Sequence, residues 1–97
     1  MRVIFHPEAY DEMFESARFF EEKTLGLGSD LIDAIQEAIS RILKFPRSGA
    51  IDQQNIRRCL VRGFPFTVLY EAHRDHIFIA AVMHQHRKPD YWTERLK

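Results

Sequence analysis

The sequence has few of the features that mark secreted or membrane-bound proteins. Its 97 residues include one cysteine, Cys59, so the chain forms no internal disulfide, and a lone thiol is typical of a reducing compartment. No stretch approaches the roughly 20 apolar residues that a membrane-spanning helix requires. His6 and Pro7 interrupt the start of the chain before an apolar run develops, which argues against a signal peptide. We therefore expect a cytoplasmic protein with no membrane partner.

The chain also lacks net charge, since fourteen basic side chains balance fourteen acidic ones. A general nucleic-acid binder usually carries strong positive charge, so that class is disfavoured. The charges are unevenly distributed, however. Residues 1–48 hold six basic and nine acidic side chains, whereas residues 49–97 hold eight basic and five acidic ones. This asymmetry predicts an acidic side, a basic side rich in arginine, and an anionic partner.

The residues that are present describe one globular domain over residues 1–97. Hydrophobic residues make up 45% of the chain and include eight phenylalanines, which indicates an aromatic-rich core. After Pro7, the apolar residues from Tyr10 to Phe20 recur at helical spacing, and a second helical pattern runs from Leu27 to Ile42. Gly26 and Gly28 lie between the two patterns and Pro46 follows the second, which predicts an antiparallel helical hairpin.

The remaining segments favour β-strands. Residues 3–5, 56–61, 66–71 and 76–84 are rich in strand-forming side chains, while residues 46–55 are typical of a loop and residues 91–95 of a last helical turn. The nearly continuous apolar run over 76–84 indicates a central strand that is buried on both faces. The predicted order is β-α-α-β-β-β(-α), an α+β fold in which a helical hairpin packs on a mainly antiparallel sheet.

Three segments of the second half resemble the RelE/ParE family of toxins from type II toxin–antitoxin systems. They are the paired-arginine segment 56–60, the Phe-Pro-Phe turn at 64–66 with its following strand, and the ending from His84 to Trp92, which has the form His-x-x-Arg-x-Pro-x-Tyr-Trp. The likeness covers nearly the whole chain, and the turn and the ending are closer to the ParE side. The resemblance implies the same β-α-α-β-β-β fold.

The resemblance also implies two alternative functions. ParE-like toxins inhibit DNA gyrase, whereas RelE-like toxins cleave messenger RNA in the ribosomal A site; both are held inactive by a cognate antitoxin in a hetero-oligomer. A third possibility is a module that has lost activity and only binds its antitoxin. We expect a ParE-like toxin that works by binding, because the net charge is zero and residues 46–62 contain no lysine, unlike the ribosome-dependent nucleases.

If the chain were a nuclease, we expect catalysis by Arg58, Arg87 and Tyr91, of which Arg87 and Tyr91 match the arginine and C-terminal tyrosine of the RelE-like enzymes. Arginine can neutralise the charge that develops on phosphate, and a tyrosine or histidine can move protons. Each residue also has a structural interpretation: Arg58 could pair with Glu71, and Arg87 could anchor the last turn through Glu94. Contacts with a target of either kind are expected from the residues of the basic half and the C-terminal segment, namely Arg58, Arg62, His84, Arg87, Tyr91, Trp92 and Arg95.

Apolar side chains on the predicted hairpin are candidates for the antitoxin contact. Phe19 points away from the Tyr10–Phe20 stripe, and Leu31 and Ile35 belong to the stripe of the second helix. Phe19 could equally fold over the edge of the hairpin. His84 and His86 share one face of a strand, but no cysteine or acidic ligand is near them in the sequence, so we expect neither a metal nor a cofactor.

Overall fold

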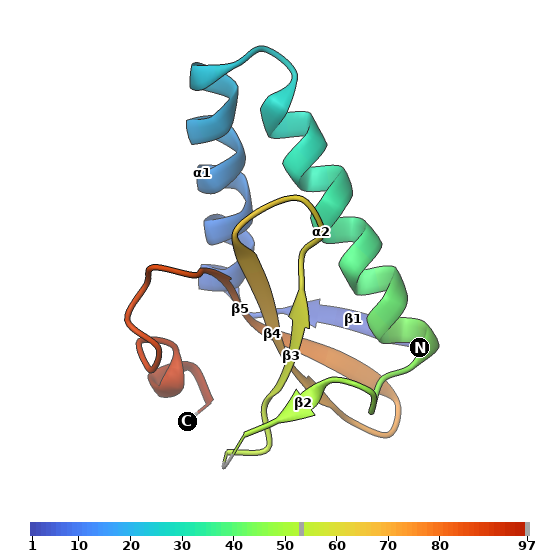
Figure 1. The fold of residues 1–97 in the computed structure, drawn as a ribbon. Helices are drawn as coiled ribbons and strands as arrows, with labels where there is room; N and C mark the ends of the chain where they lie inside the picture. Colours follow the sequence, from blue (N-terminus) through green and yellow to red (C-terminus); the bar gives the residue numbers. More distant parts are fainter. Residues whose placement is uncertain (53, 97) are drawn as a thin grey trace.

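A computed structural model describes residues 1–52 and 54–96 of the chain and shows a helical hairpin standing on a twisted sheet (Figure 1). The α+β class and the predicted order are confirmed. The elements are β1 (Arg2–Phe5), α1 (Pro7–Lys23), α2 (Leu27–Lys44), β2 (Ala50–Ile51), β3 (Arg57–Leu60), β4 (Phe66–Ala72), β5 (His76–His84) and the 3-10 helix η1 (Thr93–Leu96).

The sheet has the strand order β1-β5-β4-β3-β2. The hairpin-linked strands pair antiparallel, as predicted, but β1 lies parallel to β5, so the sheet is mixed. The sequence expectation of a plain loop over 46–55 is wrong at Ala50 and Ile51, which pair with Arg58 and Arg57. A strand of two residues is too short to show an alternating pattern, which is why the sequence did not reveal it.

Local hydrogen bonds mark the start of each helix of the hairpin. Pro7 occupies the first turn of α1, where its missing N–H costs nothing, and the Nδ1 atom of His6 accepts a hydrogen bond from the Glu8 N–H (3.0 Å). Gly26 precedes α2 in a left-handed conformation with φ of 88°. The Glu21 carboxylate accepts hydrogen bonds from the N–H groups of Gly26 (2.8 Å) and Gly28 (2.9 Å). One side chain of α1 thereby accepts hydrogen bonds from backbone N–H groups at the start of α2 that have no partner within the helix.

This cap predicts a pH-dependent stability. The hydrogen bonds from Gly26 and then Gly28 lower the pKa of Glu21 below its ordinary value of 4.5. A lowered pKa in the folded chain means that Glu21 stabilises the fold above the unfolded-state pKa and that this contribution is lost as the pH falls through the lowered value. We expect Glu21→Gln to destabilise the protein at neutral pH and to differ less from wild type in acid.

The test is the free energy of unfolding from urea denaturation at several pH values. Glu22→Gln, at the exposed neighbouring position, is the matched control and should follow the wild type throughout. A difference between wild type and Glu21→Gln that stays constant from neutral to acid pH would contradict the capping role.

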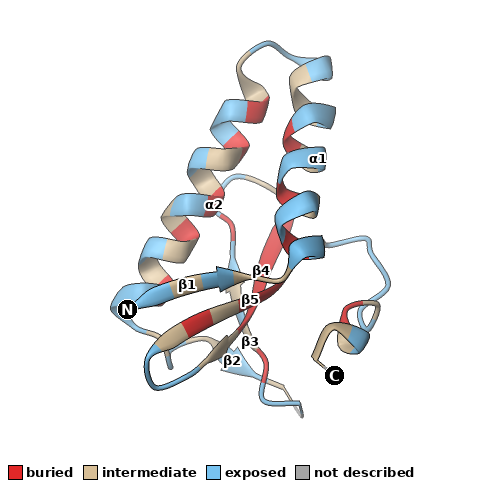
Figure 2. Ribbon diagram, turned by 180° about the vertical axis from the view of Figure 1, so that it is seen from behind, coloured by how far each residue is buried: buried red, intermediate tan, exposed pale blue. Residues whose placement is uncertain are grey.

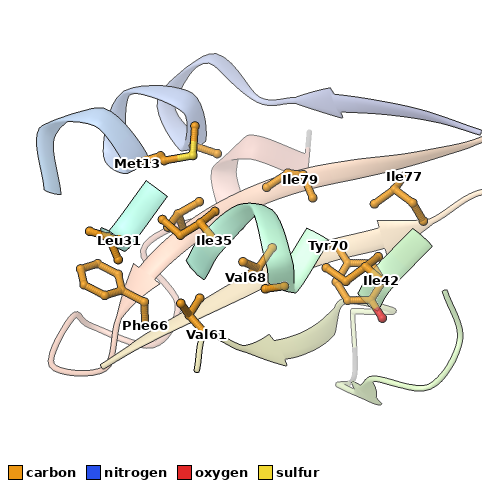
Figure 3. Packing of buried hydrophobic residues seen from close by; sticks show 13 residues of the cluster. Met13, Leu31, Ile35, Ile42, Val61, Phe66, Val68, Tyr70, Ile77 and Ile79 are labelled. Carbon is orange, nitrogen blue, oxygen red and sulfur yellow. The ribbon is translucent and has the colours of Figure 1, made fainter. Parts of the chain in front are cut away.

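The core lies on both faces of the sheet. On the helix face, side chains of the hairpin interlock with those of β4 and β5 (Figure 3), and the buried positions follow the inner sides of the helices and the length of the central strands (Figure 2). A second cluster on the opposite face joins β4 and β5 to the C-terminal segment. The prediction that 76–84 is central and buried on both faces is confirmed. Within the described ranges, neither helix is both long and apolar enough to cross a bilayer.

Candidate functional site

The C-terminal segment, residues 85–96, lies across the sheet face opposite the helices. Its anchor is Trp92, which is 2% exposed and whose indole Nε1 donates a hydrogen bond to the Pro89 carbonyl (2.7 Å). The expectation that Trp92 contacts a target is corrected, because the side chain is almost wholly buried and serves mainly as a core residue. It packs in the second core cluster with Ile56, Leu69, Ala80, Ala81 and Met83.

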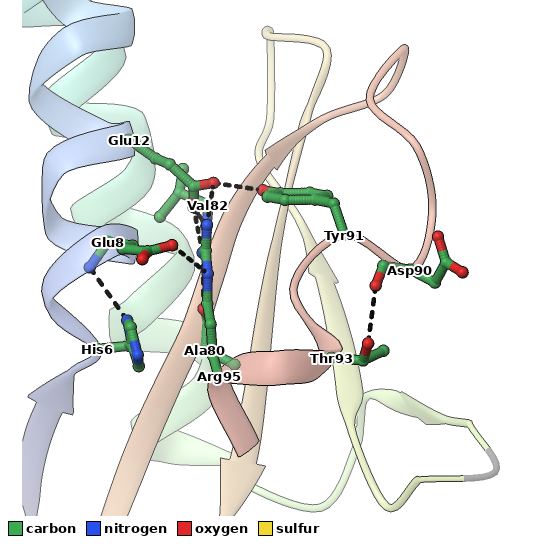
Figure 4. Close-up of polar contacts among 9 residues, drawn as sticks. All are labelled: His6, Glu8, Glu12, Ala80, Val82, Asp90, Tyr91, Thr93 and Arg95. Carbon is green, nitrogen blue, oxygen red and sulfur yellow. Dashed lines mark hydrogen bonds and ion pairs between the residues drawn. The ribbon is translucent and has the colours of Figure 1, made fainter. Parts of the chain in front are cut away.

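Glu12 of α1 holds this segment against the body of the protein (Figure 4). Its Oε1 and Oε2 atoms accept hydrogen bonds from Nη1 and Nη2 of Arg95, each at 2.9 Å, and Oε2 also accepts a hydrogen bond from the Tyr91 hydroxyl (2.6 Å). The side chains of Glu12 and Arg95 are only 14% and 8% exposed, so this is a bidentate ion pair largely removed from water. Arg95 is therefore a structural residue, which corrects its assignment as a free target contact.

The same ion pair completes the sheet where β1 ends. Pairing between β1 and β5 stops at Ile79, so the outer edge of β5 beyond that point has no strand beside it. The Val82 N–H on this edge donates to Glu12 Oε1 (3.1 Å), and Arg95 Nη1 donates to the Ala80 carbonyl (3.1 Å). Two side chains thus take the place of a strand and satisfy backbone groups that would otherwise attract another chain.

Glu8 adds a weaker contact to the cluster. Its Oε2 lies 3.2 Å from Nε of Arg95, close enough for an ion pair, but Nε makes no hydrogen bond there. The Glu8 side chain is 67% exposed, so solvent screens this attraction. Glu12, one helical turn later, is the main partner of Arg95.

Tyr91 is held in its neutral, protonated form by burial and by Glu12. Burial is the largest cause of its raised pKa, and the hydrogen bond to Glu12 and the charge of Glu12 raise it further. The Arg87 guanidinium lies 3.9 Å from the centre of the Tyr91 ring, a cation–π contact. The structure therefore brings Arg87 and Tyr91 together, but the phenol proton is directed to Glu12.

Arg58 and Arg62 lie elsewhere on the surface. Arg58 is exposed on β3 and lines a groove of about 350 Å³ together with Pro89, Asp90 and Trp92. Its side chain makes no hydrogen bond or ion pair with the residues that the structure describes; the alternative partner, Glu71, contacts a histidine instead. Arg62 is 3.6 Å from Glu37 of α2 and its side chain is 73% exposed. Both arginines are accessible to a partner.

His84 and Phe19, predicted separately, line one hollow of about 260 Å³ between α1 and the end of β5. Phe19 is 55% exposed, and His84 contacts the ring of Phe66 edge-on with centroids 5.1 Å apart. Leu31 and Ile35 are fully buried, which corrects their assignment to antitoxin binding. Both face the sheet because the apolar stripe of α2 is the side that packs inward.

Sequence reasoning missed Glu12, although this residue organises the site. The signal available was indirect: Glu12 follows the buried Ala9 by three residues and precedes the buried Met13, so it lies at the border of the inward face of α1. The excess of acid in the first half and of base in the second half is consistent with such a pairing. No local pattern joins Glu12 to Arg95, which lies 83 residues further along the chain.

Comparison with known proteins agrees with this architecture. A chain from the structure described as "Chromosomal ParDE TA system from P. aeruginosa" superposes with a TM-score of 0.70, covering 87% of this chain and 95% of that one. The two sequences are 13% identical, so this likeness shows the fold alone. No curated protein sequence matches the chain.

The family is shown by the sequence comparison. Residues 3–89 match the family model described as "ParE toxin of type II toxin-antitoxin system, parDE". With nearly the whole chain matched, the protein belongs to the ParE toxin family. The predicted resemblance to RelE/ParE toxins, closer to ParE, is confirmed.

Proposed function

We propose that the protein is a toxin that inhibits DNA gyrase by binding to it in the cytoplasm, without catalysis, and that a cognate antitoxin neutralises it. The observation that carries the proposal is membership of the ParE toxin family over residues 3–89. The exposed Arg58, Arg62 and Arg87 and the half-buried His84 are the proposed contacts with the target, because arginine is a common anchor of protein interfaces.

The state of Tyr91 favours binding over messenger RNA cleavage. A nuclease would need Tyr91 to exchange a proton with its substrate beside Arg58 and Arg87. Instead, the hydroxyl donates to Glu12 and the pKa of the phenol is raised well above its ordinary range. Arg87 then acts through its charge and its position over the ring rather than as part of a catalytic pair.

A supercoiling assay with purified gyrase and purified toxin tests the proposal. We expect micromolar toxin to abolish supercoiling, and Arg87→Glu to weaken the inhibition about tenfold, because a reversed charge at an interface removes an anchor and adds repulsion. Arg74→Glu, on the exposed turn between β4 and β5, is the matched control and should inhibit like the wild type. Unchanged supercoiling at micromolar wild-type toxin, with cleaved messages after induction in cells, would favour the nuclease alternative.

The antitoxin is the second proposed partner. We propose that Phe19 and the hollow beside His84 contribute to its contact, since an exposed aromatic side chain next to a hollow is a common anchor for a partner. The chain expressed from its own operon is expected to copurify with a small protein encoded next to it. Phe19→Ser should weaken that complex, whereas isolation of the wild-type chain alone would contradict the proposal.

A further inference from the structure

Arg87 is an exposed cation whose guanidinium is held in place without an ion pair. Its backbone N–H donates to the His84 carbonyl (2.9 Å) in the turn after β5, and its guanidinium carbon lies 3.9 Å from the centre of the Tyr91 ring. The side chain makes no hydrogen bond or ion pair with the residues that the structure describes. The contact with the ring thus leaves the N–H donors of the guanidinium available to a partner.

The Tyr91 ring that supports Arg87 is itself fixed from α1. Its hydroxyl donates a hydrogen bond to Oε2 of Glu12 (Figure 4), and Arg95 lies 5.0 Å from the centre of the same ring. Both Nη atoms of Arg95 donate to Glu12, so of the two arginines beside the ring, Arg95 is committed to the fold and Arg87 is not. A phenol that donates to a carboxylate also gains electron density on its ring, which strengthens the attraction of a cation to the ring face.

The contact with Tyr91 also competes with the attraction of acidic side chains on α1. Glu8, Asp11 and Glu15 line a hollow of about 230 Å³ together with Arg87, and all three are exposed. None of them forms an ion pair with Arg87 within the part of the chain that the structure describes. A freely moving arginine at this position would be drawn to one of these carboxylates, which would neutralise its charge. Tyr91 therefore keeps Arg87 unpaired.

We propose that Tyr91 and Glu12 are positioning residues for Arg87: they hold its guanidinium over the ring, so that its free N–H donors meet acceptor oxygens of the toxin's target. The physical gain is preorganisation, because binding immobilises side chains at an interface and a side chain that is already held loses less freedom. This inference rests on the proposed function, in which Arg87 contacts gyrase. It gives Tyr91 and Glu12 an indirect part in that contact.

A double-mutant cycle in the supercoiling assay tests the proposal with the full chain. We expect Tyr91→Leu to raise the toxin concentration that half-inhibits gyrase about fivefold, and Tyr91→Phe, which keeps the ring but loses the hydroxyl, to raise it about twofold. In an Arg87→Ala background neither change should have a further effect, because a positioning residue acts only through the residue that it holds. The matched control is Tyr10→Leu, at a 50% exposed tyrosine that packs against Phe5 and Phe14, and it should inhibit like the wild type.

Nuclear magnetic resonance of the free toxin gives a second measurement that does not involve gyrase. The heteronuclear Overhauser effect of an arginine Nε–H group reports how far the side chain moves on the picosecond to nanosecond timescale. Arg74 is the reference for a mobile side chain, since it is exposed and has no side-chain partner among the described residues. We expect restricted motion of Arg87 in the wild type, and motion like that of Arg74 in Tyr91→Leu.

Two results would overturn this inference while gyrase inhibition itself stands. One is an Arg87 side chain that is as mobile as Arg74 in the wild type. The other is a loss of inhibition on changing Tyr91 that is equally large with and without Arg87→Ala, which would mean that Tyr91 contacts the target directly or only supports the fold. If circular dichroism shows that Tyr91→Leu is unfolded, Tyr91→Phe carries the same cycle. Wild-type toxin that restrains Arg87 but leaves gyrase active would instead overturn the proposed function.

Discussion

Replacing Glu12 with alanine is expected to lower the free energy of unfolding by about 3–5 kcal/mol, because it leaves one partner of a buried ion pair without the other. The Arg95 side chain is 8% exposed and both of its Nη atoms donate to Glu12. The substitution also removes the acceptor of the Tyr91 hydroxyl and of the Val82 N–H. Urea denaturation followed by circular dichroism measures the change.

Two further variants separate the ion pair from a general effect on the helix. Glu15→Ala changes an exposed glutamate of the same helix and should alter stability by no more than about 0.5 kcal/mol. The double variant Glu12→Leu with Arg95→Met removes both charges and should be more stable than Glu12→Ala, because no unpaired charge remains buried. A loss below about 1 kcal/mol in Glu12→Ala would mean that the pair is a screened surface contact.

Replacing Gly28 with alanine is expected to destabilise the protein by about 1–3 kcal/mol through overpacking of the helical hairpin. A Cβ at this position would meet the Ala17 carbonyl oxygen of α1 at 2.4 Å and the Glu21 side chain at 3.0 Å. Because the oxygen belongs to the backbone, the two helices themselves would have to move apart. The movement would also disturb the hydrogen bond from the Gly28 N–H to Glu21.

The direction of the change makes this test decisive. Helix propensity alone predicts that alanine in place of a helical glycine stabilises by about 1 kcal/mol. Ser40→Ala, at an exposed site of the same helix, is the matched control, and its change should stay within about 0.5 kcal/mol. A thermal melt that shows Gly28→Ala to be as stable as wild type, or more stable, would rule out close contact between α1 and α2 at this point.

Most of the fold could be predicted because its signals are local. Pro7 begins α1 and Pro46 follows the end of α2, as their backbone restrictions require. The apolar run at 76–84 became the central strand β5 because a strand with neighbours on both sides and cover on both faces needs apolar side chains at successive positions. The parallel placement of β1 beside β5 has no such local signal, because it depends on where the chain returns after two helices.

The candidate site could be predicted only in part, since its residues are separated by most of the chain. The sequence pointed to the C-terminal segment and named Arg87 and Tyr91 together, and the structure places the Arg87 guanidinium over the Tyr91 ring. It treated Trp92 and Arg95 as available to a target, whereas the structure buries the first in a core cluster and pairs the second with Glu12. For Leu31 and Ile35, a helical stripe looks the same whether a sheet of the same chain or another protein covers it.

By itself, the sequence determined the α+β class, the helical hairpin and the order of the elements, because prolines, glycines and apolar periodicity act over a few residues. It also determined the likeness to ParE toxins, through the three segments of its second half. Only the tertiary structure decided which charged side chains face a partner and which hold the fold together. Glu12 and Arg95 have ordinary surface-type side chains, and their roles exist because folding brings the end of the chain to the open edge of β5. Which distant charged residues form an ion pair depends on how the whole chain folds, and no local sequence pattern shows it.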